Sequence, residues 1–427
     1  TSAYTCRIEP TTGRQYLEVT NFAGTAAIVY DLANAYRIVV NTISGGLLRV
    51  ALPAATQARE LRIIALEDNL PTPEISGANL QLPDLGDANY IILTNSLLRA
   101  GGDDPVQAYA NYRASAIGGG YQTAVVNIDD LFDQFSYGVQ QHPVAIRNFI
   151  AWQRKINPAF QYLFIIGKGR EYINLRTPEN LSAALGTTLF VPSFGYPASD
   201  NLLASHIDKP TPLVSLGRLP AINPQEVRLY LNKIQGMETF VANSPQTIEG
   251  RSWMKNVLHL GGGSTPSEQQ SIKNNLVNMG REIEDGTFGG QVTSFYKTST
   301  DPIQTSQTDQ IFSRINEGVS IITFFGHSSA NSFDFSIDQS ANYINTNKYP
   351  VMLSLGCYSG NMFTSSRSIG EEFLFLEGGG AGAFGASRGL GFIHSLGNFG
   401  RYCHQIMSED FYGESIGYGI QQAIKNY

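Results

Sequence analysis

The chain has 427 residues, 42% of them hydrophobic, and a formal net charge of −7, which suits a globular protein of two or three domains. Only 15% of the residues are charged, against roughly 25% in typical soluble domains. Neutral polar groups therefore cover much of the surface, a composition that is more common in exported proteins than in cytosolic ones. The acidic balance and the lack of a basic stripe argue against a nucleic-acid partner.

Residues 1–87 show the pattern of a small β domain. Short stretches of alternating apolar and polar residues are separated by Gly, Asn, Pro and Thr, and this spacing predicts an antiparallel β-sandwich. The predicted strands lie at 15–19, 26–30, 36–40, 47–52 and 60–66. A connection rich in Pro and Gly follows at 71–86 and separates this domain from the rest.

From Tyr90 onward, continuous apolar runs alternate with amphipathic stretches. Such alternation predicts an α/β fold of mostly parallel sheets with helices on both faces. A polar segment near 243–246 divides this part into two halves, 88–250 and 251–427. Strands are predicted at 90–93, 124–128, 162–166, 212–216, 257–260, 320–325, 350–355 and 382–386, and helices at 105–117, 145–155, 224–242 and 268–282.

Two of the predicted strands end in a chemically useful residue. The run 321–325 leads through Gly326 into His327, and the run 351–355 leads through Gly356 into Cys357. Parallel strands share a direction, so both residues are expected at the carboxyl edge, where open α/β sheets bind ligands. Adjacent strands lie roughly 5 Å apart, and the segment between the two residues is long enough for one βαβ connection.

A thiol and an imidazole at one edge suit nucleophilic catalysis. A free thiol has a pKa of roughly 8.5, and a neighbouring imidazole takes its proton and later protonates the leaving amine. The backbone N–H groups of Ser328 and Cys357 are our candidates for binding the oxyanion. The competing interpretation is a small buried Cys and a structural His, which is the role we expect for Cys403 and His404.

At these residues the sequence resembles the gingipains, a family of cysteine peptidases. The resemblance is carried by Gly-His-Ser at 326–328, Cys-Tyr-Ser-Gly at 357–360 and the aromatic Phe333 between them. It extends in order over about 88–395, through 90–94, 133–138, 145–149, 198–201, 216–220, 371–376 and 380–388. It implies two α/β subdomains with a caspase-like sheet, a thiol protease acting on protein or peptide substrates, and a location that is secreted or at the bacterial outer membrane or cell surface.

The chain also departs from the family pattern. Ser328 replaces the Gly that follows the family's His, and Gly261 or Gly262 stands where the resemblance implies an acidic third member. The sequence therefore predicts that His327 lacks an orienting carboxylate. Glu268 lies close to the family position that binds a basic P1 side chain, but we expect it to point outward as a first-turn helix residue. His394 is predicted to line the substrate cleft.

No cofactor is required by this chemistry, and a structural calcium ion stays an open expectation of the resemblance. At Gly167-Lys168 many relatives carry Gly-Asp, so a metal site at that loop is in doubt. The leading function is endopeptidase cleavage through a thioester. Two alternatives are sortase-like processing of carboxy-terminal signals in type IX secretion, with a partner in the secretion machinery or at the cell surface, and an inactive scaffold or adhesion module.

Overall fold

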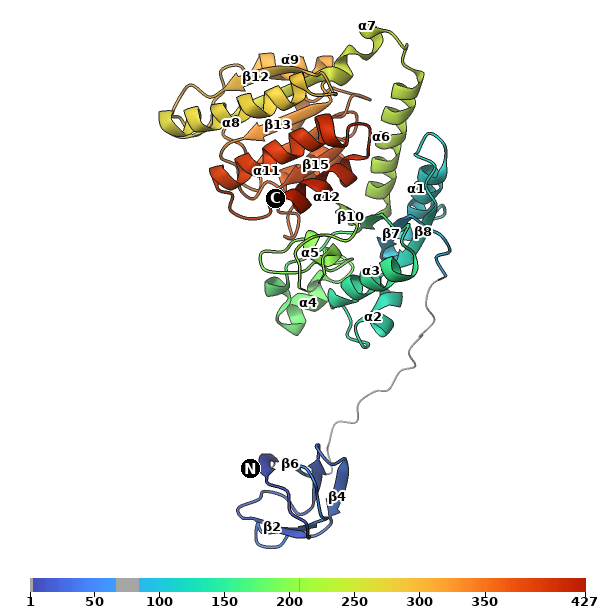
Figure 1. Ribbon diagram of the computed structural model, residues 1–427, viewed down its shortest axis with the longest axis vertical. Coiled ribbons are helices and arrows are strands. Elements are labelled where there is room, and N and C mark those ends of the chain that lie inside the picture. The colour runs from blue at the N-terminus through green and yellow to red at the C-terminus, as the bar shows by residue number, and fades with distance from the viewer. Residues whose placement is uncertain (1–2, 67–83, 207) are drawn as a thin grey trace. The chain divides into compact units, whose positions relative to one another are not determined.

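The computed structural model describes residues 3–66, 84–206 and 208–427. The chain divides into two compact units, Thr1–Gly77 and Ala78–Tyr427 (Figure 1). Most of the connection predicted at 71–86 lies outside the described residues. Within the described part of the chain, no helix is both long and apolar enough to cross a membrane.

The first unit consists of two antiparallel sheets, which fits the predicted small β-sandwich. One sheet has the order β1-β6-β3-β4 and the other pairs β2 with β5. Their bounds are β1 Ala3–Ile8, β2 Gln15–Val19, β3 Ala27–Asp31, β4 Tyr36–Val40, β5 Leu48–Leu52 and β6 Arg59–Ala65. Alternate residues of β3, β5 and β6 are buried and form one core. β1 was not among the predicted strands, since it is an edge strand whose residues are only half-buried.

The second unit begins with a parallel sheet of order β10-β9-β7-β8. The strands are β7 Tyr90–Thr94, β8 Thr123–Asn127, β9 Tyr162–Ile166 and β10 Ser215–Leu219. One face packs against α2 and α3, and the other against α1 and α6. The helices of this half are α1 Pro105–Ala114, α2 Asp129–Phe135, α3 Val144–Ile156, α4 Pro178–Ala184, α5 Asn201–Ala204, α6 Pro224–Asn243 and α7 Ile248–Arg251.

The second half carries a five-stranded parallel sheet of order β12-β11-β13-β14-β15. Its strands are β11 Asn256–Gly261, β12 Gln291–Tyr296, β13 Ile321–Phe325, β14 Val351–Leu355 and β15 Ala383–Ala386. Helices α9 Thr308–Glu317 and α10 Ile369–Phe375 cover one face. Helices α8 Pro266–Asp285, α11 Ile393–Gln405 and α12 Ile416–Asn426 cover the other (Figure 1).

The structure corrects three details of the predicted elements. β12 was missed because it is an edge strand with alternating exposure. β10 begins three residues later than predicted. The apolar run that predicted it includes Val214, which is buried in the core but precedes the strand. Between β13 and β14, the connection holds a 3₁₀ turn, Ser340–Asn342, where a βαβ crossover would hold an α-helix.

The order of the five-stranded sheet positions the site. The chain adds β12 on one side of β11 and then returns to add β13 on the other side. The strand order therefore reverses between β11 and β13, and at such a switch point the loops after the two strands separate and leave a crevice. His327 follows β13, and the loop leading to Glu268 follows β11.

Candidate active site

His327 and Cys357 follow neighbouring strands at the same edge of the sheet. β13 and β14 pair in parallel with Phe325 opposite Leu355, so each site residue lies two positions beyond a matched pair. The residue before each of them, Gly326 or Gly356, must be glycine because neighbouring atoms leave no room for a β-carbon. A β-carbon at Gly356 would lie 2.2 Å from Ser328 Oγ. One at Gly326 would lie 2.7 Å from an Asp334 carboxylate oxygen.

Ser328 joins the two strand ends. Its hydroxyl donates a hydrogen bond of 2.8 Å to the Cys357 carbonyl, so the residue that departs from the family pattern ties the His turn to the Cys turn. Within the described part of the chain, the backbone N–H groups of Ser328 and Cys357 donate to no acceptor. Both donors are therefore free to bind an oxyanion, the role that the sequence analysis predicted for them.

The Cys357 thiol is half-buried beside the loop that follows β15. The Gly391 N–H points at Sγ with a separation of 3.3 Å, and the Tyr358 N–H donates to the Gly389 carbonyl at 3.0 Å. Tyr358 has φ of +57°, a conformation that is uncommon for residues other than Gly. The chain thus turns sharply after Cys357, and the thiol faces the loop around Gly391.

The expectation that His327 lacks a carboxylate is wrong. Glu268 Oε1 lies 3.0 Å from His327 Nε2, with the Glu268 side chain 19% and the imidazole 53% exposed. The carboxylate of Glu268 therefore points neither outward nor into an empty basic-residue pocket. Burial acts to raise the pKa of Glu268, but hydrogen bonds from the Ser264 N–H and from His327 lower it below its usual value, so the group is an anion at neutral pH.

Local sequence explains why Glu268 reaches the imidazole. Thr265 caps α8 and accepts a hydrogen bond from the Glu268 N–H at 3.3 Å, and Pro266 starts the helix. Glu268 Oε2 turns back to accept the Ser264 N–H at 2.7 Å, one residue before the cap, which holds the carboxylate at the N-terminal end of α8. The pattern Thr-Pro-x-Glu was visible in the sequence, but the switch point that brings the start of α8 to His327 was not.

Asp334 supports the turn at His327, a role that no pattern in the sequence indicated. Its N–H donates to the His327 carbonyl at 2.9 Å, and its Oδ2 accepts the Gly263 N–H at 2.8 Å. Lys297 Nζ lies 3.8 Å from the same oxygen. Burial raises the pKa of Asp334. Asp334 therefore links the two loops, because its carboxylate binds the loop of Glu268 and its N–H binds the loop of His327.

His394 lies on the first turn of α11, three residues beyond Gly391. It is exposed, and its Nε2 lies 3.3 Å from the Asn398 amide nitrogen. The predicted cleft role of His394 stays a prediction. Cys403 and His404 are fully buried, which confirms the core role expected for both.

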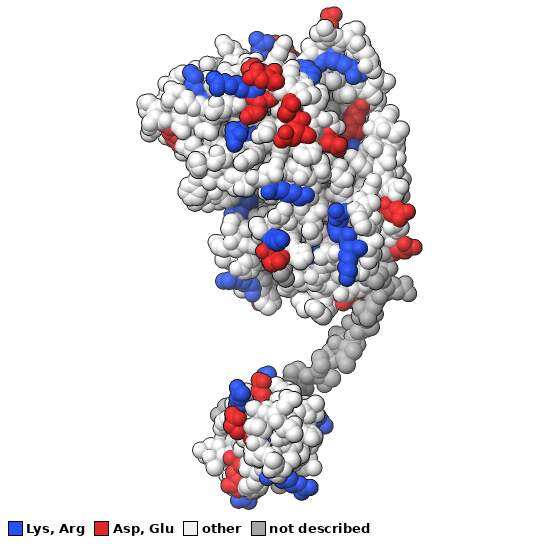
Figure 2. Space-filling view, viewed as in Figure 1, with Lys and Arg blue, Asp and Glu red and all other residues white. Residues whose placement is uncertain are grey.

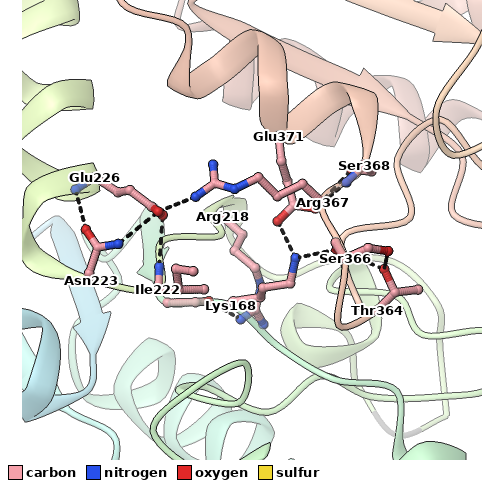
Figure 3. Close-up of polar contacts among 11 residues, drawn as sticks. Lys168, Arg218, Ile222, Asn223, Glu226, Thr364, Ser366, Arg367, Ser368 and Glu371 are labelled. Carbon is pink, nitrogen blue, oxygen red and sulfur yellow. Dashed lines mark hydrogen bonds and ion pairs between the residues drawn. The ribbon is translucent and has the colours of Figure 1, made fainter.

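A buried ion pair connects the two halves of the unit (Figure 3). Lys168, after β9, lies 2.5 Å from Glu371 on α10, and both side chains are 2% exposed. Lys168 also donates to the Ser366 carbonyl at 3.0 Å. Burial lowers the pKa of Lys168 and raises that of Glu371. Lys168 thereby holds the segment that runs from Cys357 to α10.

Lys168 also decides what the loop after β9 can bind. The ammonium group of Lys168, paired with Glu371, occupies this loop where a metal site would need an anionic or neutral ligand, so the loop does not fit a metal cation. Across residues 3–66, 84–206 and 208–427, no group of three or more His, Cys, Asp or Glu side chains is arranged to hold a metal ion. On the face that Figure 2 shows, most of the surface is uncharged, and small groups of charged residues of both signs lie on it.

The sequence model of peptidase family C25 matches residues 84–427. The chain belongs to this family. Two solved structures share the fold: a complex of the pro- and mature domains of RgpB from Porphyromonas gingivalis, and the Arg-specific cysteine proteinase gingipain R. The first has a TM-score of 0.58 and 13% identity over 79% of this chain and 73% of that one. The second has a TM-score of 0.59 and 13% identity over 80% and 74%.

These findings confirm the predicted gingipain resemblance and the caspase-like α/β fold, and they support a cysteine peptidase. No curated protein sequence matches the chain. A structure of dimeric latent PorU from Porphyromonas gingivalis has a TM-score of only 0.38, which is too low to bear on function. Identities of 13% establish the fold but not the specificity, so the roles of individual residues rest on the geometry of this site.

Proposed function

We propose that the chain is a cysteine endopeptidase in which Cys357 is the nucleophile, His327 the base and Glu268 the group that orients the base. One observation carries the proposal. A carboxylate lies 3.0 Å from an imidazole that follows the strand adjacent to the cysteine strand. A buried structural Cys would need neither a free thiol at the sheet edge nor an oriented His.

The contact between Glu268 and His327 supports a separate role for each ring nitrogen of His327. Glu268 holds Nε2, so Nε2 carries the ring proton and Nδ1 is the basic nitrogen available for the thiol. Fixing the tautomer in this way is what the carboxylate contributes in related triads. Nδ1 takes the proton of Cys357, and the thiolate attacks the carbonyl carbon of the substrate.

The attack forms a C–S bond and places a negative charge on the carbonyl oxygen. The free N–H groups of Ser328 and Cys357 would bind this oxyanion. As the tetrahedral intermediate collapses, the C–N bond breaks, and His327 gives its proton to the leaving amine. A water molecule then loses a proton to His327 and attacks the thioester, which releases the acid and restores the Cys357 thiol.

A thiol-labelling experiment tests the proposal with internal controls. Iodoacetamide at pH 6 should alkylate Cys357 much faster than Cys6 or Cys403, as measured by peptide mass spectrometry. Burial raises the pKa of Cys403 to about 12 and also raises that of Cys6, so both should react slowly. His327→Ala should slow the alkylation of Cys357. Equal, slow labelling of all three would support the inactive scaffold.

The sortase-like function uses the same thioester and differs in the group that resolves it. Adding a glycine-amide acceptor to the cleavage reaction separates the two, because transfer yields a ligated product and hydrolysis yields a free acid. We expect hydrolysis. A secreted or cell-surface location is part of the proposal and is supported by the low charged fraction of 15%. A structural calcium ion stays a prediction, to be tested by thermal unfolding with and without chelator.

A further inference from the structure

We propose that Leu390 and Phe392 select peptide substrates with a bulky apolar side chain next to the scissile bond. We call these two residues the apolar lip. The inference rests on the proposed function and adds the substrate class. Their place beside the nucleophile is set by Gly391, which lies between them and whose N–H points at Cys357 Sγ at 3.3 Å.

The apolar lip is exposed although the loop around it is held in place. Leu390 is 68% and Phe392 is 73% exposed. The same loop is tied to the nucleophile turn by the bond from the Tyr358 N–H to the Gly389 carbonyl, at 3.0 Å. A single exposed apolar residue is common. Two on a fixed loop, on both sides of the residue that contacts a catalytic thiol, form a surface that a substrate would cover.

Aromatic residues from the first half of the unit extend this surface. A β-carbon at Gly389 would lie 3.7 Å from the Pro197 ring, so the loop of the apolar lip adjoins the loop that carries Tyr196. Tyr196 is 61% exposed, and its ring packs edge-on against Tyr172 with centroids 6.1 Å apart. Apolar side chains are thus offered from both halves of the unit.

Leu390 also lines a cavity of about 590 Å³, together with Pro197, Leu396 and Phe399. This volume lies within the range of about 300–1,000 Å³ that is usual for ligand pockets. Four charged residues line the cavity as well, namely Asp200, Arg218, Glu371 and Arg388.

Each of these charges already has a partner. Arg218 makes two contacts with Asp200, at 2.7 and 2.8 Å. Glu371 binds Lys168, and Arg388 binds Glu171. Glu268, which lies close to the family position that binds a basic P1 side chain, is held by His327. A charged substrate side chain would have to compete with an intramolecular partner, whereas an apolar one gains by leaving water.

Internally quenched peptides that differ only in the residues flanking the cleavage point test the inference. Leu or Phe should exceed Arg or Asp in kcat/KM by at least about tenfold, the discrimination typical of an apolar pocket. Leu390→Ser and Phe392→Ser should each remove most of this preference and leave the iodoacetamide rate at Cys357 unchanged. Tyr137→Ser is the matched control, since Tyr137 is 92% exposed and lies in the first half of the unit.

Binding by the inactive Cys357→Ala variant, measured by fluorescence anisotropy with the same peptides, gives a second readout. Tighter binding of Leu and Phe peptides that is lost in the lip variants supports the inference even where turnover is slow. Cleavage with a preference for Arg, or lip variants that behave like the wild type, overturns the inference and leaves the peptidase intact. If no peptide is cleaved or bound and Cys357 is not selectively alkylated, both proposals fail.

Discussion

Replacing Lys168 by Met should destabilise the peptidase unit strongly, because it leaves Glu371 as an unpaired carboxylate in the interior. Both side chains are 2% exposed, and their charged atoms lie 2.5 Å apart. Removing one partner of such a pair typically costs about 3–5 kcal/mol of unfolding free energy. With an unfolding entropy of about 2.1 cal/mol/K per residue, the unit Ala78–Tyr427 should lose about 4–7 °C in Tm.

Urea unfolding followed by tryptophan fluorescence measures this loss in the relevant unit, because both tryptophans, Trp152 and Trp253, lie there. The double variant Lys168→Met/Glu371→Leu should lose less than the single one, since it buries no unpaired charge. Arg314→Met, which breaks the exposed pair with Glu317, should cause no measurable change.

The pH dependence of the loss checks its cause. Burial raises the pKa of Glu371 already in the presence of Lys168, and removing the ammonium raises it further. The carboxylate can then avoid its unpaired charge by taking up a proton, so the loss in Lys168→Met should be smaller at pH 5 than at pH 8. An unchanged urea midpoint at pH 8 would show that the pair contributes nothing net to the free energy of unfolding.

Three further predictions concern the site and the buried histidines. Cys357→Ala should abolish peptide cleavage with little change in Tm. Cys403→Ala should keep its activity and lose about 1–2 kcal/mol of unfolding free energy through the cavity it creates. Cleavage by Cys357→Ala would end the cysteine-peptidase hypothesis. Glu268→Gln should lower kcat/KM by about 10- to 1,000-fold, less than removal of the acid costs serine enzymes, and an unchanged value would show that the carboxylate does not orient the base. Burial lowers the pKa of His259 to about 3 and that of His404 to about 4, so below pH 6.5 the unfolded chain binds two protons that the folded chain does not. The contribution of the two neutral histidines to the free energy of unfolding is complete above pH 6.5 and is lost as the pH falls toward 4, by about 1.4 kcal/mol per pH unit for each group. In urea titrations His259→Leu should halve this dependence on pH. An unaltered dependence would show that the buried histidines do not cause it.

The sequence was sufficient for the parts of the molecule that depend on local patterns. Continuous apolar runs predicted most parallel strands, because strands covered on both faces contain few polar residues. The positions of His327 and Cys357 at neighbouring strand ends followed from the two runs that lead through Gly into a reactive side chain. The edge strands β1 and β12 were missed, since neither contains the continuous apolar run that marks a strand buried on both faces.

The groups that contact His327 and Cys357 depend on the tertiary structure. Glu268 meets His327 because the strand order reverses between β11 and β13, and no local pattern records that reversal. Asp334 and Lys168 likewise act through contacts between loops far apart in the chain. Because the pattern of a strand is local, the amino-acid sequence alone indicates which groups stand at the carboxyl edges of the sheet. The partner of each group depends on how the sheets and their crossovers pack, which is a property of the folded chain as a whole.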